Sequence, residues 1–199
     1  MRFTQACVLL GVLALPALAS AQIKQPGAHP LYPVELEPHL VVQWNDYGYC
    51  ANDGFGPGFR ATIPFLDNGP IPRINNNMGI GFGLDWAHFS NRCGATINGV
   101  YYGNGLSADV WSVPVVVQWN FFLLRKLSVF GEAGLVIQNR RYDNYYGGPN
   151  CNDGRNVCNS GVGVDASFSA GGRFLVTDSV GFLLRLGYPY LSAGVSILL

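Results

Sequence analysis

The most regular pattern of apolar and polar positions lies at the C-terminal end of the sequence. Between residues 191 and 199 every odd position is apolar, and small or polar residues occupy most of the even positions. A period of two is typical of a β-strand with one apolar face. Residues 180–188 alternate in the same way before Pro189. Residues 180–199 are therefore predicted to form a β-hairpin.

The same alternation recurs in earlier segments of the chain. These segments are residues 34–45, 55–65, 78–88, 110–121, 128–141 and 162–176. Polar connections rich in Gly, Asn or Pro separate them. Together with the C-terminal hairpin they give eight strands, an even number. The sequence thus predicts an all-β domain over residues 34–199, preceded by a Pro-rich lead-in at residues 22–33.

The N-terminus has the features of a secretory signal peptide. Arg2 precedes an apolar run at residues 6–18, and Ala19-Ser20-Ala21 follows it. A positive start, a short apolar core and an Ala-x-Ala site are the three parts of such a signal. The run is shorter than the roughly 20 residues that a membrane helix needs. We expect residues 1–21 to be removed after Ala21 and the remainder to be exported.

Low charge indicates that the predicted sheet lies in a membrane. Charged residues make up 12% of the chain, whereas about 25–35% is usual for the surface of a soluble domain. No later segment is apolar and long enough for a membrane helix, so a membrane location requires a closed barrel. Sparse, balanced charge also argues against a nucleic-acid partner.

Two barrels fit the alternation. In one the apolar face meets lipid, and in the other it lines the cavity of a soluble, lipocalin-like carrier. The polar face consists largely of Gly, Ser and Ala, which suit a crowded interior. We therefore predict an eight-stranded antiparallel up-and-down transmembrane β-barrel with a filled polar lumen.

The polar face also carries charged residues of both signs. They are Glu35, Glu37, Arg60, Asp85, Glu132, Arg140, Asp165, Arg173 and Arg185. Buried charges must be paired, and Arg is the preferred cation in tight pairs. We expect these residues to form a charge network in the lumen, with Glu132 paired to Arg173 or Arg185.

Aromatic residues near the strand ends of the apolar face predict a girdle at the membrane interfaces. They are Trp44, Phe65, Trp86, Trp119 and Phe121.

Four cysteines remain after the signal peptide, all in predicted connections at one end of the barrel. They are Cys50, Cys93, Cys151 and Cys158. An even number of cysteines in an exported protein indicates disulfides. Proximity favours Cys151–Cys158 and Cys50–Cys93, while the other two pairings stay open. No His lies near these cysteines, so we expect no metal site, and no motif indicates a cofactor.

Several segments resemble small outer-membrane β-barrels, the family of the outer-membrane protein A barrel and its eight-stranded relatives. They are residues 118–122, 128–132 and 188–196. The resemblance implies a monomer in the outer membrane of a Gram-negative bacterium, in contact with its lipid. It also implies that the barrel-insertion machinery recognises the C-terminal strand. The family usually ends in Phe, where this chain has Leu199. The peptidoglycan-binding part of the larger relatives is not carried over.

This family favours a structural or surface-interaction role, and the chain is not expected to be an enzyme. A small pore, a lipid A-modifying hydrolase and a soluble carrier are the alternatives. The hydrolase is suggested by His88-Phe89-Ser90-Asn91, which resembles the His-x-Ser-Asn element of outer-membrane lipid A deacylases. That resemblance would make Ser90 the nucleophile and His88 its base. Its third member, a downstream Glu, is missing from the loop that follows, where Asp109 is the nearest downstream acid.

Overall fold

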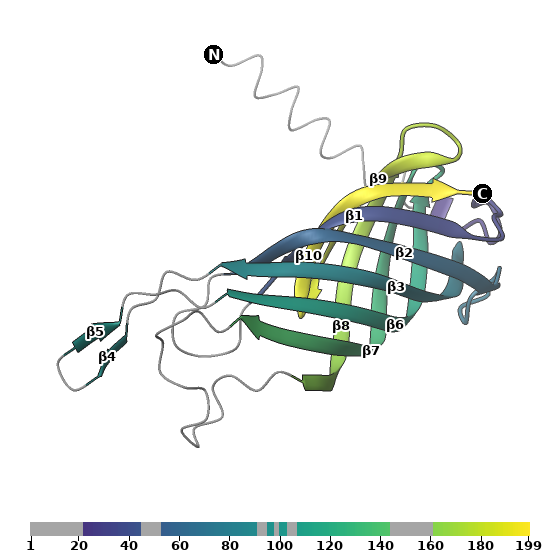
Figure 1. Ribbon diagram of the computed structural model, residues 1–199. Helices are drawn as coiled ribbons and strands as arrows, with labels where there is room; N and C mark the ends of the chain where they lie inside the picture. The colour runs from purple at the N-terminus through teal and green to yellow at the C-terminus, as the bar shows by residue number, and fades with distance from the viewer. Residues whose placement is uncertain (1–21, 45–52, 91–94, 98–99, 103–106, 144–160) are drawn as a thin grey trace, which may run out of the picture.

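A computed structural model describes most of the chain after the signal segment (Figure 1). The described residues are 22–44, 53–90, 95–97, 100–102, 107–143 and 161–199. Residues 1–21, predicted as the signal peptide, lie outside this part. So do the four cysteines predicted to form disulfides, which are Cys50, Cys93, Cys151 and Cys158.

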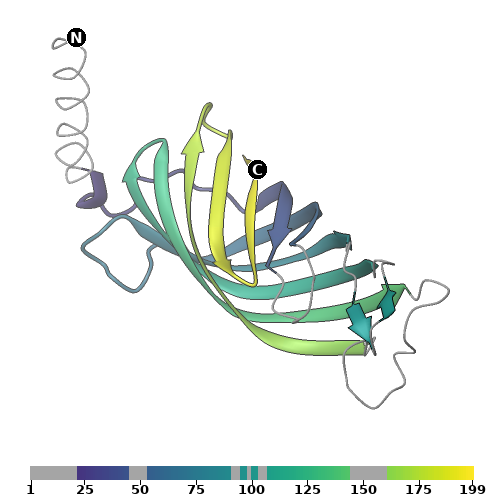
Figure 2. The same cartoon turned by 90° about the vertical axis from the view of Figure 1, so that its left-hand side faces the viewer.

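Eight strands form a closed antiparallel barrel (Figures 1 and 2). They are β1 Glu35–Gln43, β2 Gly54–Leu66, β3 Asn76–Ser90, β6 Ser107–Leu124, β7 Leu127–Asp143, β8 Gly161–Leu175, β9 Val180–Tyr188 and β10 Tyr190–Leu198. Around the barrel their order is β1-β10-β9-β8-β7-β6-β3-β2. Each barrel strand therefore pairs with the barrel strands before and after it in the sequence, and β1 pairs with β10. The predicted eight-stranded up-and-down barrel is confirmed.

The connection predicted at residues 89–109 is shorter than expected. β3 continues to Ser90 and β6 begins at Ser107, and a separate hairpin pairs β4 Ala95–Ile97 with β5 Val100–Tyr102. The barrel strands extend because the inward-facing apolar side chains continue: Ala87, Phe89 and Val110 are buried together. The prediction that residues 89–109 form only a loop was wrong. The polar residues of this connection gave no clear alternation, although two short strands form within it.

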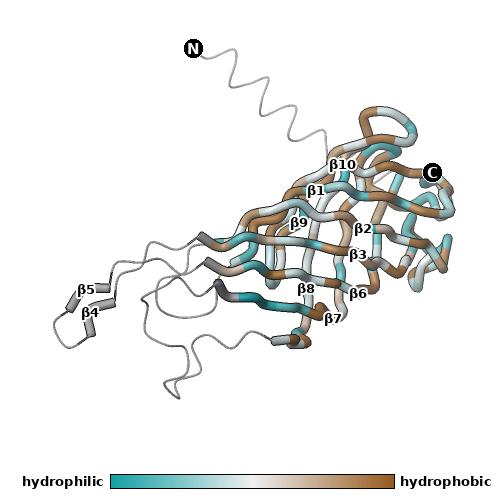
Figure 3. The backbone as a smooth tube through the Cα atoms, in the orientation of Figure 1, coloured by the Kyte–Doolittle hydropathy of each residue, from teal (hydrophilic) through white to brown (hydrophobic). Residues whose placement is uncertain are grey.

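The apolar face points outward, as the sequence predicted. In β3 the exposed side chains are Ile80, Phe82 and Leu84, whereas Asp85 is buried. Figure 3 shows the resulting alternation of hydrophobic and hydrophilic positions along the strands. The inward positions of the other strands hold buried charged side chains, among them Arg185 of β9 with an exposed fraction of 0%. A carrier with an apolar cavity is therefore ruled out for this barrel.

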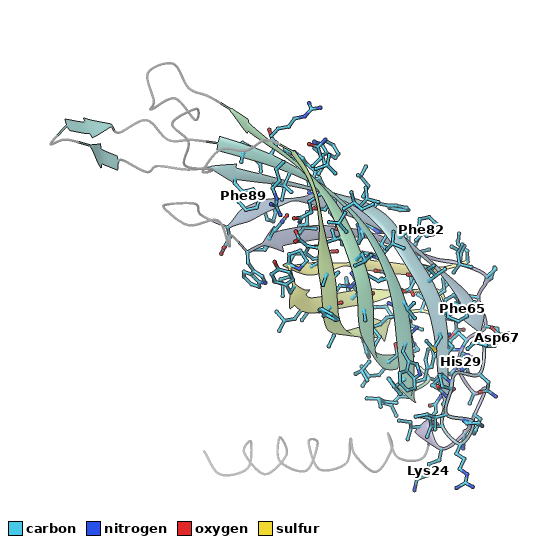
Figure 4. All side chains as sticks on the ribbon, turned by 90° about the horizontal axis from the view of Figure 1, so that it is seen from below. Lys24, His29, Phe65, Asp67, Phe82 and Phe89 are labelled. Atoms are coloured by element: carbon cyan, nitrogen blue, oxygen red, sulfur yellow. The ribbon has the colours of Figure 1, made fainter. Side chains whose placement is uncertain are left out.

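Residues 22–34, here called the N-terminal strap, pack against one end of the lumen. Tyr32 is buried with Leu175 and Leu198, which face inward from β8 and β10. The ring of His29 stacks on Phe122 of β6, with 4.5 Å between centroids. Figure 4 shows Lys24 and His29 at one end of the barrel and Phe89 toward the other. The strap therefore covers the lumen at the end where both chain termini of the barrel lie.

The strap also binds the barrel through polar contacts. His29 Nδ1 lies 2.7 Å from Asn75 Oδ1, and the backbone amide of Asn75 donates to the carbonyl of Ile23 at 2.7 Å. Burial raises the pKa of the Tyr32 hydroxyl, which keeps it neutral. Between residues 22 and 199, leaving aside the undescribed stretches, no helix is long and apolar enough to cross a membrane.

The barrel closes at a seam between β1 and β10, where small residues allow close approach. Gly194 lies opposite His39, and a Cβ added to Gly194 would lie 2.4 Å from the carbonyl oxygen of Pro38. The neighbouring Ala193 points outward and is exposed. The seam thus has no room for a side chain at position 194.

We predict that Gly194→Val destabilises the folded barrel by about 1–3 kcal/mol, because the added side chain overlaps the β1 backbone. Ala193→Val is the matched control and should have little effect, since its side chain faces away from the seam. Urea unfolding of the refolded proteins in detergent micelles measures both. Equal midpoints for the two variants would contradict the close packing at the seam.

Candidate functional site in the barrel lumen

Glu132, on the inner face of β7, is the centre of the buried charge network. Its two carboxylate oxygens accept five hydrogen bonds from donors on four other strands. The donors are Arg60 Nη1 at 2.9 Å, Gln118 Nε2 at 3.1 Å, Ser169 Oγ at 2.6 Å, and Arg185 Nε and Nη2 at 2.8 and 3.0 Å. A carboxylate offers about four lone-pair positions, so its acceptor capacity is fully used.

The two arginines that contact Glu132 carry the network to the seam strands. Arg185 Nη2 donates to Glu37 Oε2 on β1 at 2.7 Å, and Arg185 Nη1 donates to Ser192 Oγ on β10 at 3.1 Å. Arg60 Nη2 donates to the hydroxyl of Tyr190 on β10 at 2.7 Å. One connected set of bonds therefore joins β7 to both sides of the seam.

A second buried ion pair lies nearer the strap. Arg173 Nη2 and Ser196 Oγ both donate to the carboxylate of Glu35. The Cζ atoms of both buried arginines lie over the ring of Phe130, at 5.9 Å from its centroid for Arg173 and 5.3 Å for Arg185. Both distances are within the range of cation–π attraction. The ring therefore interacts favourably with both positive charges.

His39 and Asp85 form a third buried pair, toward the end of the barrel opposite the strap. The His39 ring lies with Nε2 at 2.9 Å from Asp85 Oδ1 and with Nδ1 at 2.9 Å from the backbone carbonyl oxygen of Glu37. The site is tight, because a Cβ added to Gly58 would lie 2.3 Å from Asp85 Oδ1 and 2.5 Å from His39 Nε2.

Arg140 and Asp165, the remaining predicted members of the charge network, lie in a partly exposed part of the lumen. Arg140 Nη2 donates to Asp165 Oδ2 at 3.1 Å and to Gln138 Oε1 at 2.7 Å. Both charged side chains are partly exposed. This pair is therefore in contact with solvent, in contrast to the pairs deeper in the barrel.

The structure places all the charged residues named from the sequence on the inner face of the barrel. Glu132 pairs with Arg185, one of the two partners considered, whereas Arg173 pairs with Glu35 instead. Sequence reasoning overlooked His39 as a partner, although its position two residues after Glu37 puts it on the same face. It also left out the neutral donors and acceptors of the network. These are Gln118, Ser169, Tyr190, Ser192 and Ser196.

Chemically, the network suits stability rather than binding of a large ligand. Arg, Glu and Tyr side chains occupy the interior, and the strap covers one end. An eight-stranded barrel has an interior that side chains just fill. Among the residues that the structure describes, no group of three or more His, Cys, Asp or Glu side chains is arranged to hold a metal ion.

The predicted girdle residues lie on the outer face near the strand ends. Trp44 and Phe65 are exposed, while Trp86, Trp119 and Phe121 are half-buried. The indole N–H groups of the three tryptophans have polar partners. Trp44 Nε1 donates to the Gly187 carbonyl at 3.2 Å, Trp86 Nε1 to Asp109 Oδ1 at 3.1 Å, and Trp119 Nε1 to Asn76 Oδ1 at 2.9 Å. Trp111, which was not predicted, is exposed beside Trp86, with ring centroids 6.3 Å apart.

His88, the proposed base of the hydrolase alternative, is exposed on the outer face. Its Nδ1 lies 3.0 Å from Asp109 Oδ1, the acid named from the sequence. That same oxygen also accepts the bond from Trp86. The side chain of Ser90 lies outside the described part of the structure. The described geometry is therefore an exposed His–Asp pair next to an aromatic cluster.

No protein-family model matches this sequence, and no curated protein matches it. Similar solved structures include the attachment invasion locus protein Ail of Yersinia pestis, in complex with the heparin analogue sucrose octasulfate. It shares 14% identity over 82% of this chain and 96% of Ail, with a TM-score of 0.46. Ail in a phospholipid bilayer nanodisc gives 12% identity, 85% and 100% coverage and a TM-score of 0.43. Neisserial surface protein A shares 15% identity over 83% of this chain and 96% of its own chain, with a TM-score of 0.48.

We predict that Glu132→Gln destabilises the barrel by about 3–5 kcal/mol, because Arg60 loses its carboxylate partner in a buried place. The matched control is Asp178→Asn, which removes the exposed Arg125–Asp178 pair, whose atoms are 3.8 Å apart. Exposed pairs contribute little, so this variant should unfold like the unchanged protein. Urea titration in micelles distinguishes the two, and a wild-type midpoint for Glu132→Gln would disprove a central role.

Proposed function

We propose that the protein is an integral outer-membrane β-barrel of a Gram-negative bacterium with a structural or surface-interaction role. The observation that carries this proposal is the outer face, where large apolar side chains are exposed along the barrel strands. Examples from widely separated strands are Phe59, Leu135, Phe168 and Leu184. Soluble proteins rarely expose apolar patches of more than a few hundred Å². Lipid is the solvent that such a surface fits.

The distribution of aromatic residues supports the same location. Trp44, Trp86 and Trp111 lie toward the strand ends opposite the strap, and Trp119 and Phe121 lie near the strap. Aromatic residues near both ends of the strands are typical of barrels that span an outer membrane. The hydrogen-bonded indole N–H groups fit the polar side of each interface.

Export and assembly follow from the remaining expectations. Residues 1–21 serve as a signal peptide that is cleaved, and the C-terminal strand with Leu199 is recognised by the insertion machinery. The barrel then functions as a monomer, with the segments at the end opposite the strap on the cell surface. Disulfides among the four cysteines there, Cys151–Cys158 and Cys50–Cys93 in the favoured pairing, stabilise a surface for an external ligand.

The other functions have less support. A pore needs a continuous water-filled path, but charged side chains fill the lumen and the strap covers one end of it.

For the hydrolase alternative, the His88–Asp109 pair supplies a base and an orienting acid on the outer face. Mass analysis of lipid A from cells that express the protein or its Ser90→Ala variant tests that activity directly, and we expect no difference between the two samples.

Heat-modifiability on a gel tests the membrane barrel. We expect the protein only in the outer-membrane fraction, and unboiled samples should migrate differently from boiled samples because the closed barrel resists detergent. A non-reducing gel also reports the disulfides, since reduction should alter the boiled band. A protein found in the soluble fraction without detergent would contradict the proposal.

Tryptophan fluorescence tests which surface meets lipid. All four tryptophans of the chain lie on the outer face, so brominated lipids should quench most of the emission. A variant with Trp119 as the sole tryptophan should respond best to bromine near the headgroup. A matched variant lacks all four native tryptophans and carries the substitution Val115→Trp. Its emission should respond best to bromine deep in the acyl chain. Equal, weak quenching at all depths would be inconsistent with a spanning barrel.

A further inference from the structure

The buried charges of the lumen balance only if one additional proton is bound there. Within the described residues, the buried acidic side chains are Glu35, Glu37, Asp85 and Glu132, and the buried guanidinium groups are those of Arg60, Arg173 and Arg185. Four negative charges against three positive charges leave one negative charge. An uncompensated buried charge is unfavourable by several kcal/mol, so the interior requires one more positive charge or one neutralised carboxylate.

The hydrogen bonds of His39 show where this proton is held. The Nδ1 atom faces the backbone carbonyl oxygen of Glu37, which can only accept a hydrogen bond, so Nδ1 carries a proton. The Nε2 atom faces Asp85 Oδ1 at 2.9 Å. A neutral imidazole has one N–H, and it is already used. The second contact therefore needs a further proton between Nε2 and Asp85.

From these two independent observations we propose that the His39–Asp85 pair is a proton-binding site that makes the lumen electrically neutral. The bound proton makes His39 an imidazolium, and the charge of the buried side chains becomes four negative and four positive. Removing this proton at higher pH leaves one negative charge in the closed interior, where it destabilises the folded barrel.

The other ionisable groups of the buried network lie on five strands. They are Glu37 on β1, Arg60 on β2, Arg185 on β9, Tyr190 on β10 and Glu132 on β7. The arginines are engaged with Glu37 and Glu132, and Arg60 also donates to the Tyr190 hydroxyl. Each guanidinium group therefore has other partners, and His39 is the base that directly contacts Asp85.

The other two histidines of the chain provide an internal control. His29 is also buried, but only its Nδ1 has a partner, because Nε2 has no hydrogen bond in the described structure. A single contact of this kind fits a neutral ring. His88 is exposed on the outer face, where its Nδ1 contacts Asp109 Oδ1. One protein thus contains one ring of each kind.

NMR of ¹⁵N-histidine-labelled, refolded protein in micelles tests the protonation directly at about pH 7.5, roughly one unit above the titration of a free imidazole. Spectra of His29→Gln and His88→Gln assign the signals of His39 by elimination, so His39 itself stays unchanged. We expect the two ring nitrogens of His39 to have similar shifts, as in an imidazolium ring, and those of His29 to differ widely. Widely separated His39 shifts would overturn the proposal and direct attention to Glu35 as the protonated group.

Asp85→Asn provides a test that a merely structural role would not pass. This variant leaves three carboxylates and three guanidinium groups, and its amide can donate to Nε2. We therefore expect His39 to become neutral at the same pH while Nδ1 keeps its proton. An imidazolium signature that persists in this variant would contradict the charge-balance argument.

The pH dependence of unfolding gives a second readout. If the folded state holds one more proton than the unfolded state, the unfolding constant rises about tenfold per pH unit above roughly pH 6.5. We expect that rise in the unchanged protein between about pH 6.5 and 9, and its loss in Asp85→Asn. Parallel curves for the two proteins would refute the proton site.

Discussion

Buried charge is the constraint on which the rest of this structure depends. A barrel with an apolar exterior must place its polar residues inside, where water is scarce and each charge needs a partner. The network around Glu132 meets this requirement with arginines from β2 and β9, and it extends to β1 and β10 through Arg185. The same side chains that satisfy one another also connect strands distant in the sequence. Polar residues therefore form the core of this barrel, and aliphatic residues form its surface.

The sequence was sufficient to predict the eight strands of the barrel, its closure and the direction of the apolar face, but not the additional β4–β5 hairpin. Alternation is a local property, and the near absence of charge identifies the outer face because a solvated surface would need it. Pairing within the lumen was harder to predict. Arg173 bonds with Glu35 rather than with Glu132, because the register of β7 and β8 places Arg173 opposite Ser128 and Ser169 opposite Glu132. Periodicity fixes which face a side chain occupies but not its height along the axis.

Two residues show what else the pattern could not reveal. His39 belongs to the polar face by parity, yet its partner Asp85 lies 46 positions away, and only the barrel brings them together. Tyr32 lies in a segment without any period, and it is buried because the strap folds back over the lumen. Trp111 was overlooked, although it is the second residue of the predicted strand at residues 110–121 and has the same parity as the outward-facing residues of that strand.

Pairing of β1 with β10 has a consequence for how the protein is made. These strands are far apart in the sequence, so the hydrogen bonds that remove the last free edge form only after β10 has been synthesised. Until then β1 presents an unpaired edge that invites other strands. A chain that lacks β10 would keep two such edges. Arg60 of β2 and Arg185 of β9 would also lose the hydrogen-bond acceptors Tyr190 and Ser192. The barrel therefore keeps a free edge until the nine residues of β10 are available to pair with β1.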